Sequence, residues 1–164
     1  MEIQEAFHNI LNPNFRDPQL TVWSCLIVGK LKLNMDGSSK EDPGQSGYKE
    51  LLRDELGTWR TNHYHAKGLT NIDIESDSQT AMELILDGAE MNSPYRALIE
   101  DANFLLGRCQ CSITSIPRET NSCADDLANL GVNQQELTIF LDDPPNSICP
   151  LLITDMRNIS SSRD

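Results

Sequence analysis

The sequence predicts a single α/β domain built on a mixed β-sheet. Residues 31–35 and 71–75 alternate apolar and polar side chains, as strands with one buried face do. Residues 79–86 and 95–106 instead place apolar side chains at helical spacing. Strands first, then strands and helices in alternation, is the order typical of an α/β fold. A length of 164 residues suits one domain with tails.

Turn and cap signals predict the remaining elements. Residues 36–39 are predicted to break the first strand, and the second and third strands are predicted over 48–54 and 58–64. Ser78 is a good N-cap for the first helix, and Gly107 is predicted to end the second. A strand over 112–116 follows. Asn121 or Ser122 then caps a third helix, for which Gly131 is the predicted stop.

The two ends of the chain differ in composition from its middle. Residues 1–28 contain Asn-Pro and Asp-Pro pairs and are predicted to be a short helix or a loose arm. Residues 133–164 contain Asp142-Asp-Pro-Pro145 and a polar end, and little regular structure is expected there. We therefore divide the chain into an N-terminal arm (1–28), a domain (29–132), and a C-terminal extension with a polar tail (133–164).

The formal net charge of −12 limits the kinds of partner. Affinity for nucleic acid usually comes from Lys and Arg that neutralise phosphates, so tight unassisted binding is not expected. A carboxylate-lined metal site remains compatible, because bound cations reverse the local sign. The sequence has no apolar run long enough to span a membrane and no targeting signal at its start, so we expect a cytoplasmic or nuclear location.

Cysteine and histidine give no strong metal signal. Five cysteines without a secretion signal are expected to be reduced. Cys109-Gln-Cys111 is too closely spaced for a typical zinc knuckle, so ordinary, partly buried thiols are predicted. His63 and His65 alternate on one face and could in principle bind metal, but a surface loop or edge strand is the preferred interpretation.

Three aspartates are the candidate functional residues. Asp36 and Asp77 are predicted to close strands, and Asp125 lies in the first turn of a predicted helix. Carboxylates from two strand ends and a helix start can converge at one edge of a sheet. Hard cations such as Mg²⁺ prefer such oxygen ligands, and a pair of them can activate water against a phosphodiester. The alternative is ordinary turn and cap chemistry.

The residues around these aspartates resemble a known family. The segments at 31–40, 44–54 and 72–78 resemble the first, second and fourth strands of ribonuclease H type-1 domains, and the segment at 116–129 resembles their fifth strand and last helix. The form is the one common in plant genomes and related to retroelement (reverse transcriptase-like) enzymes. The resemblance extends over residues 29–155. It implies a ribonuclease H-like mixed sheet flanked by helices.

The resemblance also implies roles for individual residues. Asp36, Asp77 and Asp125 match metal-binding, catalytic carboxylates that hold Mg²⁺ or Mn²⁺ and position water against the RNA strand of an RNA–DNA hybrid. Ser38, Ser39, Arg118 and Asn121 match positions that touch nucleic acid, although a cap role for Asn121 is an equal alternative.

One expected part of the family pattern is missing. The family carries a catalytic glutamate on a helix between its third and fourth strands, but only Ala66-Lys-Gly-Leu69 separates His65 from Thr70. We therefore expect this helix to be missing and the third strand to be reduced or rerouted. No other acid is predicted to replace the glutamate: Glu75 is expected to point away from Asp77, and Glu83 away from the site.

Three hypotheses follow. The first is a degenerate ribonuclease H-like domain that binds metal weakly and is weakly active or inactive on a weakly bound nucleic acid. The second is an active nuclease completed by an acid from an unexpected segment or a partner chain. The third is a non-catalytic acidic module that binds a basic protein partner.

Overall fold

A four-stranded mixed sheet forms the centre of the domain. The computed structural model describes residues 23–40, 45–60, 70–88, 90–132 and 139–161. Its strands are β1 (Leu31–Lys40), β2 (Gln45–Arg53), β3 (Ile72–Ser76) and β4 (Ser112–Ser115). The strand order is β2-β1-β3-β4, in which only the β1–β2 pair is antiparallel. The predicted α/β fold with a mixed sheet is confirmed.

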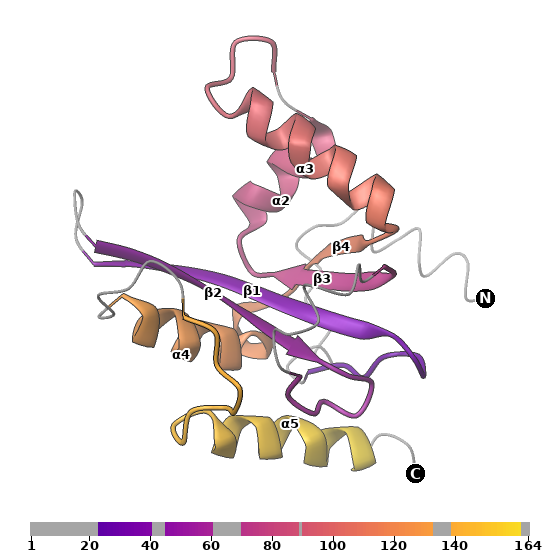
Figure 1. Ribbon diagram of the computed structural model, residues 1–164, viewed down its shortest axis with the longest axis vertical. Coiled ribbons are helices and arrows are strands. Elements are labelled where there is room, and N and C mark those ends of the chain that lie inside the picture. The colour runs from indigo at the N-terminus through magenta and orange to yellow at the C-terminus, as the bar shows by residue number, and fades with distance from the viewer. Residues whose placement is uncertain (1–22, 41–44, 61–69, 89, 133–138, 162–164) are drawn as a thin grey trace.

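Helices lie on both sides of this sheet (Figure 1). On one side are α2 (Gln79–Asp87) and α3 (Arg96–Cys109), which contact each other, and α2 also contacts β4. On the other side, α4 (Ser122–Gly131) packs on β1 and β2, and α5 (Cys149–Ser161) contacts α4. A 3₁₀ turn, η2 (Arg118–Thr120), leads from β4 into α4.

The main core lies between β2, α4 and α5. Its buried members are Leu51, Cys123, Leu127, Ile148 and Leu152. Gly47 allows the close approach of α4 to β2, because a Cβ there would lie 2.9 Å from the backbone nitrogen of Val132. This packing holds the C-terminal end of α4 close to β2.

Two predicted element ends were wrong. The first strand continues through Asp36 to Lys40, because residues 36–40 pair with β2, for example Gly37 with Tyr48. Gly107 does not end α3. The helix continues to Cys109 and is capped by Gln110 in the left-handed conformation, with φ of 54°. The predicted Ser78 cap is confirmed: its side chain accepts from the Ala81 amide.

The third strand is reduced among the described residues. Trp59 forms one isolated antiparallel bridge with Arg53, and the Arg60 amide donates to the Leu52 carbonyl at 2.8 Å. Residues 61–69, which include His63, His65 and the short link predicted to replace a helix, lie outside the described residues.

Both predicted tails contain ordered packing. The expectation of little regular structure after residue 133 was wrong, because α5 has 13 residues. Ile148 and Leu152, four residues apart, bury one side of its first turn in the core. At the other end, Trp23 is 2% exposed although it lies in the predicted arm. The division of the chain at 28 and 132 stays a prediction.

Candidate functional site

The carboxylate of Asp36 lies in an unfavourable environment for a negative charge. Its Oδ2 atom is buried and has no hydrogen-bond partner in the described part of the chain. Burial raises the pKa of Asp36 from 3.8 to about 6, helped by the negative charges of Asp77 and Asp125. Three acids distant in sequence therefore lie within electrostatic range of one another.

Asp77 follows β3 and is tied to the same edge by Asn121. The Asn121 side-chain nitrogen donates to Asp77 Oδ1 at 3.2 Å and to the carbonyl of Met35, the residue before Asp36, at 3.1 Å. Asn121 is fully buried and starts α4, the helix of Asp125. One amide thus connects the three segments that carry the acids. Asn121 is the N-cap residue of α4, as predicted, and its backbone carbonyl accepts from the Asp125 amide, but its side chain makes no cap hydrogen bond.

Asp125 lies in the first turn of α4 and is paired with a cation. Arg118 Nη2 donates to Asp125 Oδ1 at 3.0 Å, and the Arg118 side chain is 75% exposed. This hydrogen bond, together with the negative charges of Asp125 and Asp77, raises the pKa of the Arg118 guanidinium. Arg118 therefore partly neutralises the acidic group from its solvent side.

The trio is not arranged around one point. Among the residues that the structure describes, no three His, Cys, Asp or Glu side chains lie close enough to hold one ion. Like-charged carboxylates repel each other in a poorly solvated site, and Asp125 turns to Arg118. The fold brings the three acids to one edge, but they do not form a ligand cage.

The atoms at this edge nevertheless fit a hard cation. The Oδ2 atom of Asp36 and the Oδ1 atom of Asn121 are both buried oxygens without a hydrogen-bond partner. Buried polar atoms are costly when unpaired, and a divalent cation is the partner that carboxylate and amide oxygens suit. Burial and, next to it, repulsion from Asp77 raise the pKa of Asp36, and a cation would offset both effects.

The expected direction of Glu75 relative to Asp77 stays a prediction, because Asp77 lies beyond the end of β3 (Ile72–Ser76). Glu75 itself lies directly beside Asn34 of β1. Both of its carboxylate oxygens have partners on β1: Lys32 Nζ lies 2.6 Å from Glu75 Oε1, and Asn34 donates to Glu75 Oε2 at 2.9 Å. Glu75 is therefore a paired structural acid rather than a free fourth ligand.

A buried polar network involves Asn34, which lies on β1 two residues before Asp36, and the sequence analysis did not predict it. Arg53 donates to Asn34 at 2.7 Å and to Asp155 of α5 at 2.6 Å, and it stacks on Trp23 at 4.2 Å from the ring centre. The sequence did contain a signal for this network: Lys32, Asn34 and Asp36 are two residues apart along β1 and so share one face of the strand. These residues are polar, so the buried side of the strand was assigned to the apolar residues between them.

The other predicted site residues are placed as follows. Arg118 and Asn121 lie beside the trio, as described above. Ser38 and Ser39 lie on β1 beyond Asp36, opposite Gly47 and Ser46, and their side chains fall outside the described part. Glu83 is exposed on α2.

The cysteines take no part in the site. Cys109, Cys111 and Cys149 are partly buried as predicted, whereas Cys25 is exposed, contrary to expectation. Cys123 is buried in the core, and this burial raises the pKa of its thiol to about 12. Its thiol is therefore poorly reactive.

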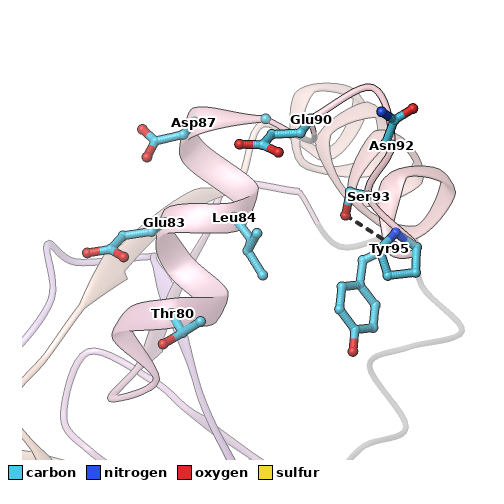
Figure 2. Close-up of a pocket in the computed structure, with 10 residues that line it drawn as sticks. Thr80, Glu83, Leu84, Asp87, Glu90, Asn92, Ser93 and Tyr95 are labelled. Atoms are coloured by element: carbon cyan, nitrogen blue, oxygen red, sulfur yellow. Dashed lines mark hydrogen bonds between the residues drawn. The ribbon is translucent and has the colours of Figure 1, made fainter.

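A pocket of about 770 Å³ lies away from the trio (Figure 2). It is formed by α2 and the loop that leads to α3. Its lining includes the carboxylates of Glu83, Asp87 and Glu90 and the ring of Tyr95. None of Asp36, Asp77 and Asp125 lines it, so this hollow is separate from the candidate site.

Comparisons with known proteins point to one kind of domain. A family model described as reverse transcriptase-like matches residues 62–131, which include Asp77 and Asp125. The chain is also 26% identical over 157 residues to a protein of Arabidopsis thaliana whose name assigns it provisionally to ribonuclease H. That match includes 81% of this chain and 25% of the relative, so the chain spans about a quarter of the length of the curated protein it matches.

Solved structures share the architecture. Ribonuclease H1 from the archaeon Halobacterium salinarum NRC-1 aligns with a TM-score of 0.54 and 25% identity over 62% of this chain and 96% of that chain. LC11-RNase H1 in complex with an RNA/DNA hybrid aligns with a TM-score of 0.50 and 19% identity over 63% and 97%. At 19% identity, the likeness to LC11-RNase H1 shows a shared fold alone. No helix in the described ranges is both long and apolar enough to cross a membrane.

Proposed function

We propose that, on a ribonuclease H-like fold, this chain binds a divalent cation weakly through Asp36, Asp77 and Asp125 and slowly hydrolyses the RNA strand of an RNA–DNA hybrid. The observation that carries the proposal is Asp36. Its buried oxygen has no hydrogen-bond partner in the described part of the chain, and burial together with the charges of Asp77 and Asp125 raises its pKa to about 6, an environment that a bound cation would stabilise. A bound Mg²⁺ or Mn²⁺ would supply an activated water and charge stabilisation at the phosphodiester.

Low activity is part of the proposal. Efficient two-metal chemistry needs enough carboxylates to hold both ions, and losing one lowers the occupancy of the second ion most. Glu75, two residues before Asp77 in the chain, is already paired with Lys32 and Asn34. Arg118, which lies on Asp125, also competes with a cation for that carboxylate.

Arg118 has a second proposed role in holding nucleic acid. It is the exposed cation beside the trio, and a phosphate could pair with its guanidinium once a metal ion engages Asp125. Ser38 and Ser39 are the further proposed contacts on β1. With a net charge of −12, the protein is expected to bind hybrid weakly and with strong salt dependence.

A cleavage assay on labelled RNA annealed to DNA tests this function. We expect cleavage in Mn²⁺ to exceed that in Mg²⁺, because Mn²⁺ is bound more tightly by most protein sites. The rate should lie at least about a hundredfold below the ~10 s⁻¹ typical of enzymes. Asp77→Asn should abolish it. Asp126→Asn is the matched control, since Asp126 is the exposed neighbour of Asp125 and should not matter.

Two outcomes would contradict the proposal. Turnover at an ordinary enzymatic rate, abolished by Asp77→Asn, would mean that the site is complete and not degenerate. If Mn²⁺ changes neither the cleavage rate nor the melting temperature of the unchanged protein, the three aspartates bind no cation.

Asn121→Ala should lower metal affinity by about tenfold to a hundredfold, the usual cost of losing a group that orients metal ligands. Asn121 positions Asp77 and the Met35 carbonyl next to Asp36 through two hydrogen bonds. Calorimetric titration with Mn²⁺ measures the effect. Asn103→Ala is the control, because Asn103 donates only to the Ile85 carbonyl between α2 and α3. A lower melting temperature with unchanged Mn²⁺ affinity would mean that Asn121 is merely structural.

The acidic interaction module stays an alternative, as does a cytoplasmic or nuclear location. Capture of a basic protein that survives Asp36→Asn and disappears in high salt would favour this alternative over metal-dependent chemistry.

A further inference from the structure

Two cysteines flank the residue that caps the C-terminal end of α3. Cys109 is the last residue of α3, and Cys111 lies immediately before β4, where the helix leads into the sheet (Figure 1). Both thiols are free and partly exposed. Neither belongs to the core cluster between β2, α4 and α5. Both are therefore accessible to a small reagent in solution.

The backbone between the two cysteines already has the turn that a disulfide needs. Gln110 is left-handed, with φ of 54° and ψ of 38°. Its amide donates to the Gly107 carbonyl, and the Cys111 amide donates to the Leu106 carbonyl. Residues two apart in a helix have Cα atoms ~5.4 Å apart, and the mirror-image turn gives the same separation. Disulfides usually join Cα atoms about 4.4–6.8 Å apart, so this pair lies within that range.

The sulfur of Cys111 is turned back toward Cys109. Its Sγ atom lies 3.8 Å from the Cys109 carbonyl oxygen. The same carbonyl accepts from the Asn71 amide at 2.9 Å, which holds the end of α3 against the residue before β3. The fold therefore keeps both cysteines in place, one on each side of a single residue.

We propose that Cys109 and Cys111 form a reversible dithiol–disulfide site that exchanges with small disulfides such as oxidised glutathione. The thiolate of one cysteine attacks the S–S bond of oxidised glutathione and releases one glutathione thiolate. The other cysteine thiolate then attacks the protein sulfur of this mixed disulfide, which forms the Cys109–Cys111 bond and releases the second glutathione thiolate. The two glutathione thiolates take up the two protons that the protein thiols lose. The protein is thus oxidised by two electrons, and one oxidised glutathione is reduced to two thiols.

The folded backbone distinguishes this pair from any two cysteines close in sequence. A left-handed residue with a Cβ is costly in an unfolded chain, whereas the cap of α3 holds Gln110 in that conformation. The fold therefore raises the effective concentration of one thiol at the other. The closed loop is very short, so the bond removes little entropy from the unfolded chain and adds little stability. Such a disulfide stays open to reduction.

A redox titration of the full chain tests the proposal. The protein is equilibrated with mixtures of reduced and oxidised glutathione, quenched with N-ethylmaleimide and digested for mass spectrometry. We expect a peptide in which Cys109 and Cys111 form an internal disulfide. The equilibrium constant for this disulfide should be at least about tenfold lower in concentrated urea, where the fold no longer holds the turn.

Single substitutions supply the matched controls. In Cys109→Ser and in Cys111→Ser, the remaining thiol should carry a glutathione adduct instead of an internal bond. The exposed Cys25 should form the same adduct in the unchanged protein and in both variants. Phenylarsine oxide, which bridges two neighbouring thiols, gives an independent measurement. It should protect Cys109 and Cys111 from maleimide in the unchanged protein, but not the remaining thiol of either variant.

Two results would overturn the proposal. If Cys109 and Cys111 carry separate glutathione adducts at every ratio and phenylarsine oxide protects neither, the two sulfurs do not reach each other. If the internal disulfide forms with the same equilibrium constant in the folded and the urea-unfolded chain, the cap of α3 makes no contribution and the site is not a property of the fold.

Discussion

Replacing Arg53 by methionine is expected to cost about 3–5 kcal/mol of unfolding free energy, the usual result of removing one member of a buried ion pair. Arg53 is fully buried and bonds to Asp155 at 2.6 Å and to Asn34 at 2.7 Å. It also stacks on Trp23. The substitution leaves the Asp155 carboxylate without its cation. It also releases the N-terminal Trp23 and the C-terminal helix α5 from a shared anchor.

Urea denaturation of the full chain measures this loss. Arg60→Met is the matched control and should cost less than about 1 kcal/mol, as exposed ion pairs do. Arg60 is 43% exposed, and without it Asp54 still accepts hydrogen bonds from the amides of Leu56 and Thr58. The double variant of Arg53→Met with Asp155→Leu should recover part of the loss, because no unpaired charge then remains. Equal costs for Arg53→Met and Arg60→Met would contradict the buried network.

Asp36→Asn should stabilise the protein at pH 8 and remove its response to metal. Partial burial and then the charges of Asp77 and Asp125 disfavour the ionised form of Asp36 in the folded state. Asp36 is only partly buried, so solvent screening limits the gain to about 1 kcal/mol, or a rise of about 2–4 °C in melting temperature. Mn²⁺ should raise the melting temperature of the unchanged protein but not that of the variant.

The pH dependence of this gain has a definite sign. The pKa of Asp36 is raised from 3.8 to about 6 on folding, so between these values the folded state binds more protons than the unfolded state. Stability therefore falls as pH rises through this window, and the penalty is complete above about pH 6. The advantage of Asp36→Asn should be present at pH 8 and absent near pH 4.

Thermal melts across this pH range provide the measurement. Asp101→Asn, an exposed acid on α3, is the control and should show no such window. A gain from Asp36→Asn that is the same at pH 4 and pH 8 would mean that folding does not raise the pKa of Asp36.

Local patterns were sufficient for most of the elements. The alternation in residues 31–35 and 71–75 and the helical spacing in 79–86 and 95–106 correctly predicted β1, β3, α2 and α3. The ends were less predictable, because pairing with β2 extends β1 through Asp36. Propensity also failed for α5, where Ile148 and Leu152 gain their stability from a core built by distant residues.

From short motifs and local periodicity, the sequence alone predicted a family resemblance, most of the strands and helices, and three candidate acids. The tertiary structure alone decided how those acids are placed. Asn121 links Asp77 to β1, and Arg118 draws Asp125 aside. Lys32 and Asn34 hold Glu75. Each of these is an electrostatic contact between residues far apart in the chain or in different elements, and its strength depends on burial that no local pattern encodes.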